Sequence, residues 1–423
     1  MGDYTSLESL LQLAPTGVNP FAFVEVLIEK ALHPEHPPYM KGVLRFFGAV
    51  YVLSMIVCSA ILIIPWCRGQ RDRAKYQWLW KKLDIEAGST PYHMPNGGLS
   101  MAILQLISSL ISGLYVVMLY YSIDSPQVDR RSYGLIWADI RLLPMYLGFW
   151  LTAWASFAFS ITSPRKTLSR HLSPKPVFFN AFCFLFAFII VIFGIYFTVY
   201  QLKELSKSYA LHDIFIEKLH YLGDQWNHTS GTVVLTNEIF KLEMAYKACA
   251  LSTLAILVQT EKTGLFWAIA AAPVLAFYGI ALWAFLTLLR GSAQIASGKV
   301  SVLDHHKVTV QDKGSSTPMD SVIVKIDSNR SEPQKRNDAD NLARTYQSMA
   351  IRAVLLSTFL IYDLITAGIH LHAKHEALSD GKTRAMIKIL RFSGSLPILF
   401  AMATQCYYLF TDPSEKTSGD HEK

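Results

Sequence analysis

Apolar positions along this chain gather in seven long blocks, and charged residues are concentrated between the blocks. A soluble core is built from shorter periodic runs, so unbroken blocks of about 20 residues indicate helices that cross a bilayer. The blocks are Val43–Pro65, Leu99–Tyr121, Leu142–Thr162, Val177–Tyr200, Gly264–Leu289, Met349–Leu371 and Ala385–Phe410.

These blocks predict an all-α polytopic membrane protein, a bundle of seven transmembrane helices. At ~1.5 Å per residue each block can cross a hydrocarbon layer of ~30 Å, and a helix satisfies its own backbone groups within one such segment. Composition agrees, because 52% of the 423 residues are hydrophobic and only 17% are charged. Aromatic residues at block ends, such as Trp66, Tyr121 and Tyr200, are typical of the membrane interface.

The apolar run within Met244–Thr260 leaves the number of spans open. The run is short, carries Lys247 and is closed by Glu261 and Lys262. We therefore expect an amphipathic helix outside the bilayer that leads into the fifth span. An eighth span is the alternative, and it would move everything after it to the opposite side of the membrane.

The first 42 residues are predicted to be an external segment with one interfacial helix. They lack a basic n-region and an apolar h-region, so the first span itself would act as an uncleaved insertion signal. Within Pro20–Leu32, the residues Phe21, Val24, Leu27 and Ile28 share a helical face. We expect this helix to lie on the outer membrane surface or to cap the bundle, with a ligand lid as the alternative.

Basic residues in the short connectors predict the orientation. The connector after the third span carries Arg165, Lys166 and Arg170 without any acidic residue, and the connector after the first span is also basic. Because basic short loops stay in the cytoplasm, we expect the N-terminus outside and these three residues facing a cytoplasmic partner. The sequon at Asn227 then lies outside and is the predicted glycosylation site, whereas the sequon at Asn329 lies inside and should be unused.

Two further polar segments are predicted to be cytoplasmic. The connector Arg290–Ser348 has no sustained apolar period, so we expect it to be largely disordered and suited to phosphorylation or partner docking. The tail Thr411–Lys423 is short and polar. The halves show no internal repeat and no paired broken spans of the transporter kind, although Pro144, Pro273 and Pro397 predict kinks.

Cysteine usage and motifs exclude several function classes. Five cysteines are too few and too scattered for a disulfide framework; Cys67, beside Arg68 at the end of the first span, is a palmitoylation candidate or an ordinary free thiol. Nucleotide-binding, hydrolase and metalloprotease motifs are missing, and no basic-aromatic pattern suggests nucleic acid. We therefore predict no enzymatic activity, no cofactor and no metal site.

The candidate site is a pair of charged residues in two neighbouring spans. Asp363 lies near the middle of the sixth span and Arg391 in the outer third of the seventh, both ~10–12 Å below the outer surface at ~1.5 Å per residue. An unpaired charge there is costly, so we predict an Asp363–Arg391 ion pair. It could be a packing clamp, part of a ligand site or switch, or an ion relay. Asp139 and Arg141 are instead expected to reach the interface.

The overall layout resembles that of G-protein-coupled receptors. The resemblance rests on seven spans, an external N-terminus, a glycosylatable external connector and a long polar loop between the fifth and sixth spans. It covers nearly the whole chain as topology alone: the third span ends Phe159-Ser-Ile-Thr162 without an Asp-Arg-Tyr motif, and the seventh has Leu396-Pro397-Ile398 in place of Asn-Pro-x-x-Tyr. Pro65-Trp66 before a basic loop is similar to fungal pheromone receptors, which implies a divergent, fungal-type group.

The resemblance implies a receptor that passes an external signal to a cytoplasmic partner such as a G protein, with the plasma membrane favoured over an endomembrane. It also implies an outer-half ligand cavity with Asp363, Tyr362, Thr366 and Arg391 as its polar lining. Two readings from other classes stay open. One is a secondary transporter or channel that uses Asp363, and the other is a non-catalytic scaffold that acts through the Arg290–Ser348 loop.

Overall fold

The computed structural model of the chain describes residues 6–32, 36–83, 90–123, 134–162, 174–228, 236–296, 332–372 and 381–411. Within these residues, seven helical segments are long and apolar enough to cross a membrane, so the chain is an all-α integral membrane protein. The spans are formed by α3 (Met40–Cys67), α5 (Gly97–Ser122), α7 (Gly134–Ile140) with α8 (Leu142–Thr162), α9 (Pro176–His228), α10 (Thr236–Ala296), α11 (Glu332–His372), and α13 (Gly381–Ser393) with α14 (Ser395–Thr411).

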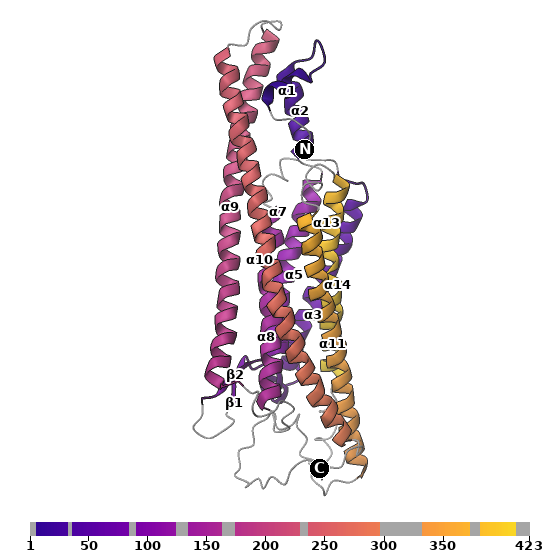
Figure 1. Cartoon of the computed structure of the whole chain (residues 1–423). Coiled ribbons are helices and arrows are strands. Elements are labelled where there is room, and N and C mark those ends of the chain that lie inside the picture. Colours follow the sequence, from indigo (N-terminus) through magenta and orange to yellow (C-terminus); the bar gives the residue numbers. More distant parts are fainter. Residues whose placement is uncertain are drawn as a thin grey trace.

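The spans pack side by side into one bundle (Figure 1). Helix α10 contacts α8, α9 and α11, while α3 contacts α5 and α14. The centre is largely aromatic: Phe149 stacks on Phe359 with ring centroids 5.5 Å apart, and Trp150 stacks on Phe186 at 4.1 Å. Aromatic rings bury a large surface area and stack in preferred geometries, so these contacts hold α8 against both α9 and α11.

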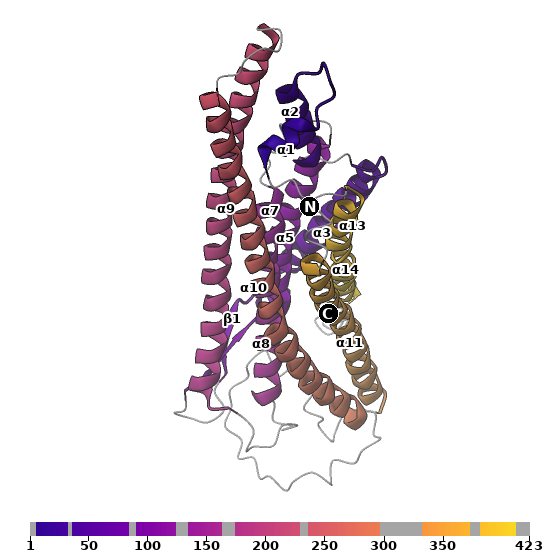
Figure 2. The same cartoon turned by 45° about the horizontal axis from the view of Figure 1, so that its top comes forward.

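Two helices extend far beyond the others. Helix α9 has 53 residues and α10 has 61, which at ~1.5 Å per residue is roughly 80 and 90 Å, almost three times the ~30 Å hydrocarbon layer. Both project together past the end of the bundle (Figures 1 and 2). Met244–Thr260 lies within α10, so this segment continues into the fifth span, and seven candidate spans remain.

The projecting parts of α9 and α10 form an antiparallel coiled coil. Buried residues on α9 alternate in steps of three and four, which keeps one seam facing the partner helix. Phe215 of α9 packs on Tyr246 of α10, with ring centroids 5.8 Å apart. The seam residues of α9 are Gln201, Leu205, Ser208, His212, Phe215, Leu219 and Leu222.

The N-terminal helices pack against this coiled coil. They are α1 (Leu7–Gln12) and α2 (Pro20–Leu32), and their apolar faces join Phe215, Leu219 and Leu242 in one core. The Asn19 side chain donates a hydrogen bond to the Gly223 carbonyl at 2.8 Å. Local apolar periodicity predicted the helix α2 correctly, but it could not show that an apolar surface outside the bilayer would cover it.

We call this assembly the head. It comprises α1, α2, the part of α9 from Lys203 to His228 and the part of α10 from Thr236 to Lys262. The head lies at the end of the bundle where α13 begins (Figure 1).

Two spans are broken, which corrects the expectation that the chain has no paired broken spans. Helix α7 ends at Ile140, four residues before Pro144, and α13 ends at Ser393, four residues before Pro397. A proline ring clashes with the carbonyl four residues earlier and removes one helical hydrogen bond, so each helix stops where its proline requires. At the second break, a Cβ on Gly394 would lie 3.0 Å from the Phe359 ring, so the bare glycine allows close contact with α11.

The end of the bundle away from the head carries a small hairpin (Figure 1). It follows α4 (Gln70–Tyr76) and consists of antiparallel strands β1 (Trp80–Leu83) and β2 (Tyr92–Pro95). The Asn180 side chain of α9 clamps it, accepting from the His93 N–H at 3.0 Å and donating to the Pro91 carbonyl at 2.8 Å.

The connector Arg290–Ser348 is helical at both ends, which differs from the expected disorder. Helix α10 continues to Ala296 and α11 begins at Glu332. Residues 297–331 and 412–423, which include the sequon at Asn329 and most of the predicted tail, lie outside the described residues.

Candidate functional site

The two broken spans meet α11 at a group of four charged residues. These are Asp139, Arg141, Asp363 and Arg391, and we call them the charge cluster. Each carboxylate interacts electrostatically with both guanidinium groups, so the formal charges balance. Asp139 is 7% exposed and Arg141 is 8% exposed. The expectation that these two residues reach the interface was therefore wrong, because the break in the third span keeps them within the bundle.

Arg141 occupies the gap between α7 and α8 and joins four segments. Its guanidinium donates hydrogen bonds to the Ala138 carbonyl in the last turn of α7 and to the Arg391 carbonyl in the last turn of α13, each at 3.2 Å. It also donates to the Tyr51 hydroxyl of α3 at 3.3 Å. The Ser108 hydroxyl of α5 donates to the Arg141 carbonyl at 3.0 Å.

This arrangement solves the chemical problem that each break creates. The last carbonyls of a helix have no partner within that helix, and the end of the helix carries a partial negative charge. A guanidinium has five donors in a rigid fork, so one side chain can serve both helix ends at once. Arg141 thereby stabilises both breaks and fixes the two half-helices relative to each other.

Asp363 forms its direct hydrogen bond with Tyr146 of α8. The Tyr146 hydroxyl donates to Oδ2 of Asp363 at 2.5 Å, in the range of a charge-assisted bond. The Tyr146 ring stacks on Trp267 of α10, with centroids 5.4 Å apart and planes 11° apart. The carboxylate on α11 is therefore linked through one tyrosine to both α8 and α10.

The structure brings Asp363 and Arg391 to the same cavity, but the direct ion pair that we predicted between them does not form. Both side chains line the same cavity and interact electrostatically. The two side chains do not form a direct ion pair, because none of the ion pairs within 4.0 Å between described residues joins Asp363 to Arg391. Counting residues from the connector gave the depth of each side chain, but it gave no information on the direction of each side chain around its helix.

The cavity inside the charge cluster is small. Its volume is about 20 Å³, and its lining includes Tyr51, Ser108, Asp363, Arg391 and Ser395 from five helices. That volume holds about one water molecule, whereas sites for small-molecule ligands measure roughly 300–1,000 Å³. In this conformation, the cluster is a closed packing element.

The two other residues predicted to line a ligand cavity have structural roles. The Tyr362 hydroxyl donates to the Leu390 carbonyl at 2.9 Å, so it holds α11 against α13. The Thr366 hydroxyl donates to the Tyr362 carbonyl of its own helix at 2.9 Å. Neither residue lines the cavity inside the cluster.

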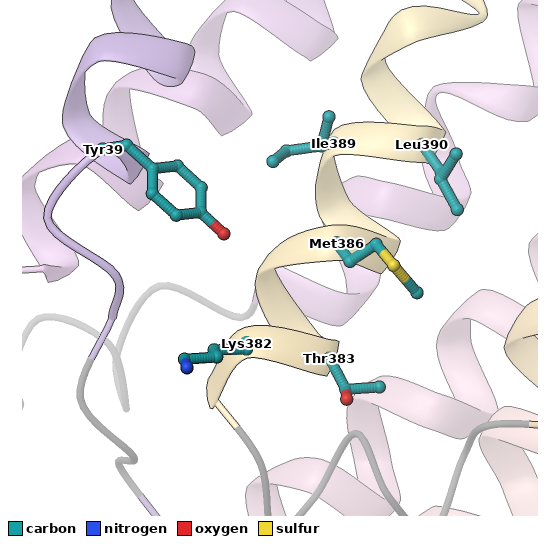
Figure 3. Close-up of a pocket in the computed structure, with 6 residues that line it drawn as sticks. All are labelled: Tyr39, Lys382, Thr383, Met386, Ile389 and Leu390. Atoms are coloured by element: carbon teal, nitrogen blue, oxygen red, sulfur yellow. The ribbon is translucent and has the colours of Figure 1, made fainter.

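A larger groove lies at the head end of the bundle, between the start of α3 and α13. Figure 3 shows Tyr39 facing α13 across an open space, with Ile389 and Lys382 on the side of α13 toward it. Its volume is about 330 Å³, and Lys382 and Thr383 add polar groups. Leu390 also borders the groove, and the next residue is Arg391 of the charge cluster, so one short helix separates the groove from the cluster.

The end away from the head displays aromatic and basic side chains. Arg73 lies over the Trp66 ring at 3.4 Å, and Lys81 lies over Trp78 at 4.5 Å. Burial of its ammonium lowers the pKa of Lys81, and burial raises the pKa of the hydroxyl of Tyr92, the first residue of β2. This composition is typical of a membrane–water interface.

The remaining predicted sites divide between the described and undescribed parts of the chain. Arg165, Lys166 and Arg170 lie in the undescribed segment 163–173. Cys67 is a free, exposed cysteine at the end of α3. Asn227 is exposed near the end of α9, and its side-chain oxygen accepts a hydrogen bond from Asn19 at 3.1 Å.

Sequence reasoning missed the role of Tyr146, and it missed the role of Arg141 although the sequence marks the break beside that residue. A signal was present, because Arg141-Leu-Leu-Pro144 and Gly394-Ser-Leu-Pro397 repeat the same spacing, in which a helix stops four residues before its proline.

Comparisons of the chain with protein-family models, with curated proteins and with solved structures find no match.

Proposed function

We propose that the chain is a receptor-like membrane protein that transmits an external signal to a cytoplasmic partner. The observation that carries this proposal is the continuity of α9 and α10, which run unbroken from the head into the bundle. Within the bundle, Trp267 of α10 stacks on Tyr146, the hydrogen-bond partner of Asp363. A ligand that displaces the head would therefore change the contacts of the charge cluster.

The charge cluster has the properties of a two-state element. Closed, it satisfies the ends of α7 and α13 through Arg141 around a cavity of about 20 Å³. Separation of those ends would leave buried charges and carbonyls without partners, which costs several kcal/mol unless water or a ligand replaces the contacts. Such a penalty favours two discrete packings over a gradual deformation.

The groove beside α13 supplies a second route for a signal. Its mixture of apolar side chains with Lys382 and Thr383 suits an amphipathic ligand at the membrane interface. Because α13 also carries Arg391, a ligand that moves this helix would alter the hydrogen bond from Arg141 to the Arg391 carbonyl.

The orientation in this proposal rests on the basic connectors, which favour an external head and a cytoplasmic hairpin. The connector with Arg165, Lys166 and Arg170 would then face a cytoplasmic partner. No catalytic step is part of this function.

The proposal is tested with the full chain in vesicles that also contain heterotrimeric G proteins. Receptors have basal activity, so we expect the chain to accelerate nucleotide exchange several-fold over empty vesicles. The triple variant Arg165→Glu, Lys166→Glu and Arg170→Glu should abolish that acceleration while it leaves the described bundle intact. If the wild-type chain and the triple variant give the same exchange rate, the assignment of this partner and this surface is wrong.

A secondary transporter or channel is the second candidate, and the paired breaks favour it. Ion and substrate sites in transporters are commonly built where spans are discontinuous near the bilayer midplane. Proton or sodium flux into reconstituted vesicles under an imposed gradient measures this function directly. Flux that is present in the wild type and lost in Asp363→Asn would support transport over the receptor proposal.

A further inference from the structure

The head carries a row of large apolar side chains on the outside of α10. Phe240, Met244, Leu251, Leu254 and Val258 have exposed fractions between 42% and 68%. The seam that packs against α9 is a different face of the same helix, since it contains Leu242 and the buried Ser252. We call these five exposed residues the α10 stripe.

Lipid does not explain this stripe, because the neighbouring helix is charged at the same height. The antiparallel register is fixed by two contacts: Gly194 lies against Trp267, and Phe215 packs on Tyr246. That register places Leu254 and Val258 level with Lys207 and Lys203 of α9, which are both exposed. A bilayer deep enough to cover the stripe would also bury these lysines at a cost of several kcal/mol.

The spacing of the stripe is that of a coiled-coil surface. The steps from Phe240 to Met244, from Leu251 to Leu254 and from Leu254 to Val258 are four, three and four residues, which keeps the side chains on one face. Two exposed alanines, Ala250 and Ala255, flank the centre of the stripe. Small flanking side chains let a second helix approach closely.

We propose that a second copy of this chain covers the α10 stripe, so that the protein is a dimer joined through its heads. The face continues into the bilayer at Leu265 and Ile269, which are also exposed, so the occupant should rise from the same membrane in the same direction. A second copy meets this requirement, because it has an α10 of equal length. Two copies in one membrane share a two-fold axis along the bilayer normal, so each stripe residue meets its own counterpart.

The exposed area is adequate for such a dimer. Five large side chains, each about half exposed, present on the order of 500 Å² per copy, so a symmetric pair buries on the order of 1,000 Å², near the lower limit of specific interfaces. The continuation of α10 inside the bilayer adds further contact.

One residue interrupts the stripe and makes the proposal sharper. Lys247 occupies the position between Met244 and Leu251, and its ammonium pairs with Glu243 at 2.7 Å. A charged residue at one layer of a coiled coil lowers stability while it fixes the register and the number of strands. Replacement of Lys247 with leucine should therefore complete the stripe and strengthen the dimer.

The first test counts copies by single-molecule photobleaching of the labelled full chain in native membranes. We expect two-step bleaching for the wild type, at least a tenfold higher dimer dissociation constant for Leu251→Lys with Leu254→Lys, and a lower one for Lys247→Leu. Because all three positions are exposed, monodisperse behaviour in detergent should be the same for every variant. Single-step bleaching of the wild type, or equal dissociation constants for all variants, would overturn the proposal.

The second test uses disulfide formation in a background with the five native cysteines replaced by alanine. Leu254→Cys should give a disulfide-linked dimer on mild oxidation, since the residue meets its own copy. Lys207→Cys is the matched control, because it is exposed at the same height on α9. Equal cross-linking at both positions would indicate random collision, and cross-linking of Leu254→Cys only to another protein would identify a different occupant. Either result contradicts the second copy.

Discussion

The Arg141 side chain stabilises both breaks in the bundle. It is 8% exposed, and its guanidinium reaches the ends of α7 and α13 together with Tyr51 of α3. Arg391 also belongs to the charge cluster, but it accepts the hydrogen bond from Arg141 with its backbone carbonyl and not with its side chain. The two arginines therefore differ in what their side chains are needed for.

We therefore expect lysine to lower the free energy of unfolding at position 141 but to change it little at position 391. Arg141→Lys keeps the charge but loses the planar fork, so two buried carbonyls lose a donor and the free energy of unfolding should fall by about 2–4 kcal/mol. Arg391→Lys keeps both the charge and the backbone bond, so its effect should stay within about 0.5 kcal/mol. Thermal unfolding of the purified chain in detergent measures both. Equal losses would contradict a special role of the Arg141 guanidinium in capping the two helix ends.

The bond between Tyr146 and Asp363 allows a second residue-level prediction. A hydrogen bond to a charged group contributes about 1.5–3 kcal/mol, so Tyr146→Phe and Asp363→Asn should show a coupling energy of that size in a double-mutant cycle. The matched cycle of Asp363→Asn with Arg391→Met should give a smaller coupling, because that pair makes no direct contact. Additive effects in the first cycle would contradict the hydrogen bond as a stabilising contact.

The depth of Asp363 and Arg391 could be predicted from the sequence, but their partners could not. Depth follows from the rise per residue alone. The partner depends on helix rotation and on the break at Arg141, and a lone Tyr146 in an apolar block carries no sign of its hydrogen bond. The same limit explains why Asp139 and Arg141 were expected at the interface.

At the scale of elements, block boundaries were predictable because the bilayer sets them. The predicted block Val43–Pro65 became α3, Met40–Cys67, and the predicted block Leu99–Tyr121 became α5, Gly97–Ser122. The head was not predictable in this way. Its coiled-coil seam includes Ser208 and His212, and these polar residues interrupt the apolar periodicity that would indicate a helix pair.

The breaks between α7 and α8 and between α13 and α14 could not be predicted from hydropathy. Hydropathy is the same whether an apolar block is one helix or two, so only the proline spacing distinguishes them. Pro397→Ala restores an N–H that can donate to the Ser393 carbonyl, so amide exchange around Gly394 should slow by at least about tenfold. Pro273→Ala is the control, because α10 is already continuous there. Unchanged exchange near Gly394 would mean that its packing on Phe359 sets the break.

At the scale of the whole molecule, the orientation in the membrane is the premise of the proposed function. The head must face outward for an external ligand to act on α9 and α10. The predicted glycan at Asn227 reports on this premise, because glycosylation occurs on the lumenal side of the membrane. Asn227 lies 24 residues beyond Lys203, roughly 36 Å from the start of the head at ~1.5 Å per residue, and its side chain is exposed.

The decisive measurement compares the wild type with Asn227→Gln and Asn329→Gln in a microsomal expression system. We expect the wild type to carry an endoglycosidase-sensitive glycan that Asn227→Gln removes and Asn329→Gln leaves in place. The contact from Asn19 is compatible with this glycan, because it uses the Asn227 side-chain oxygen and leaves the nitrogen free for the sugar. A glycan on Asn329 would instead put the head in the cytoplasm. The same long helices would then couple a cytoplasmic input to the charge cluster, and the receptor proposal would fail while the fold remained unchanged.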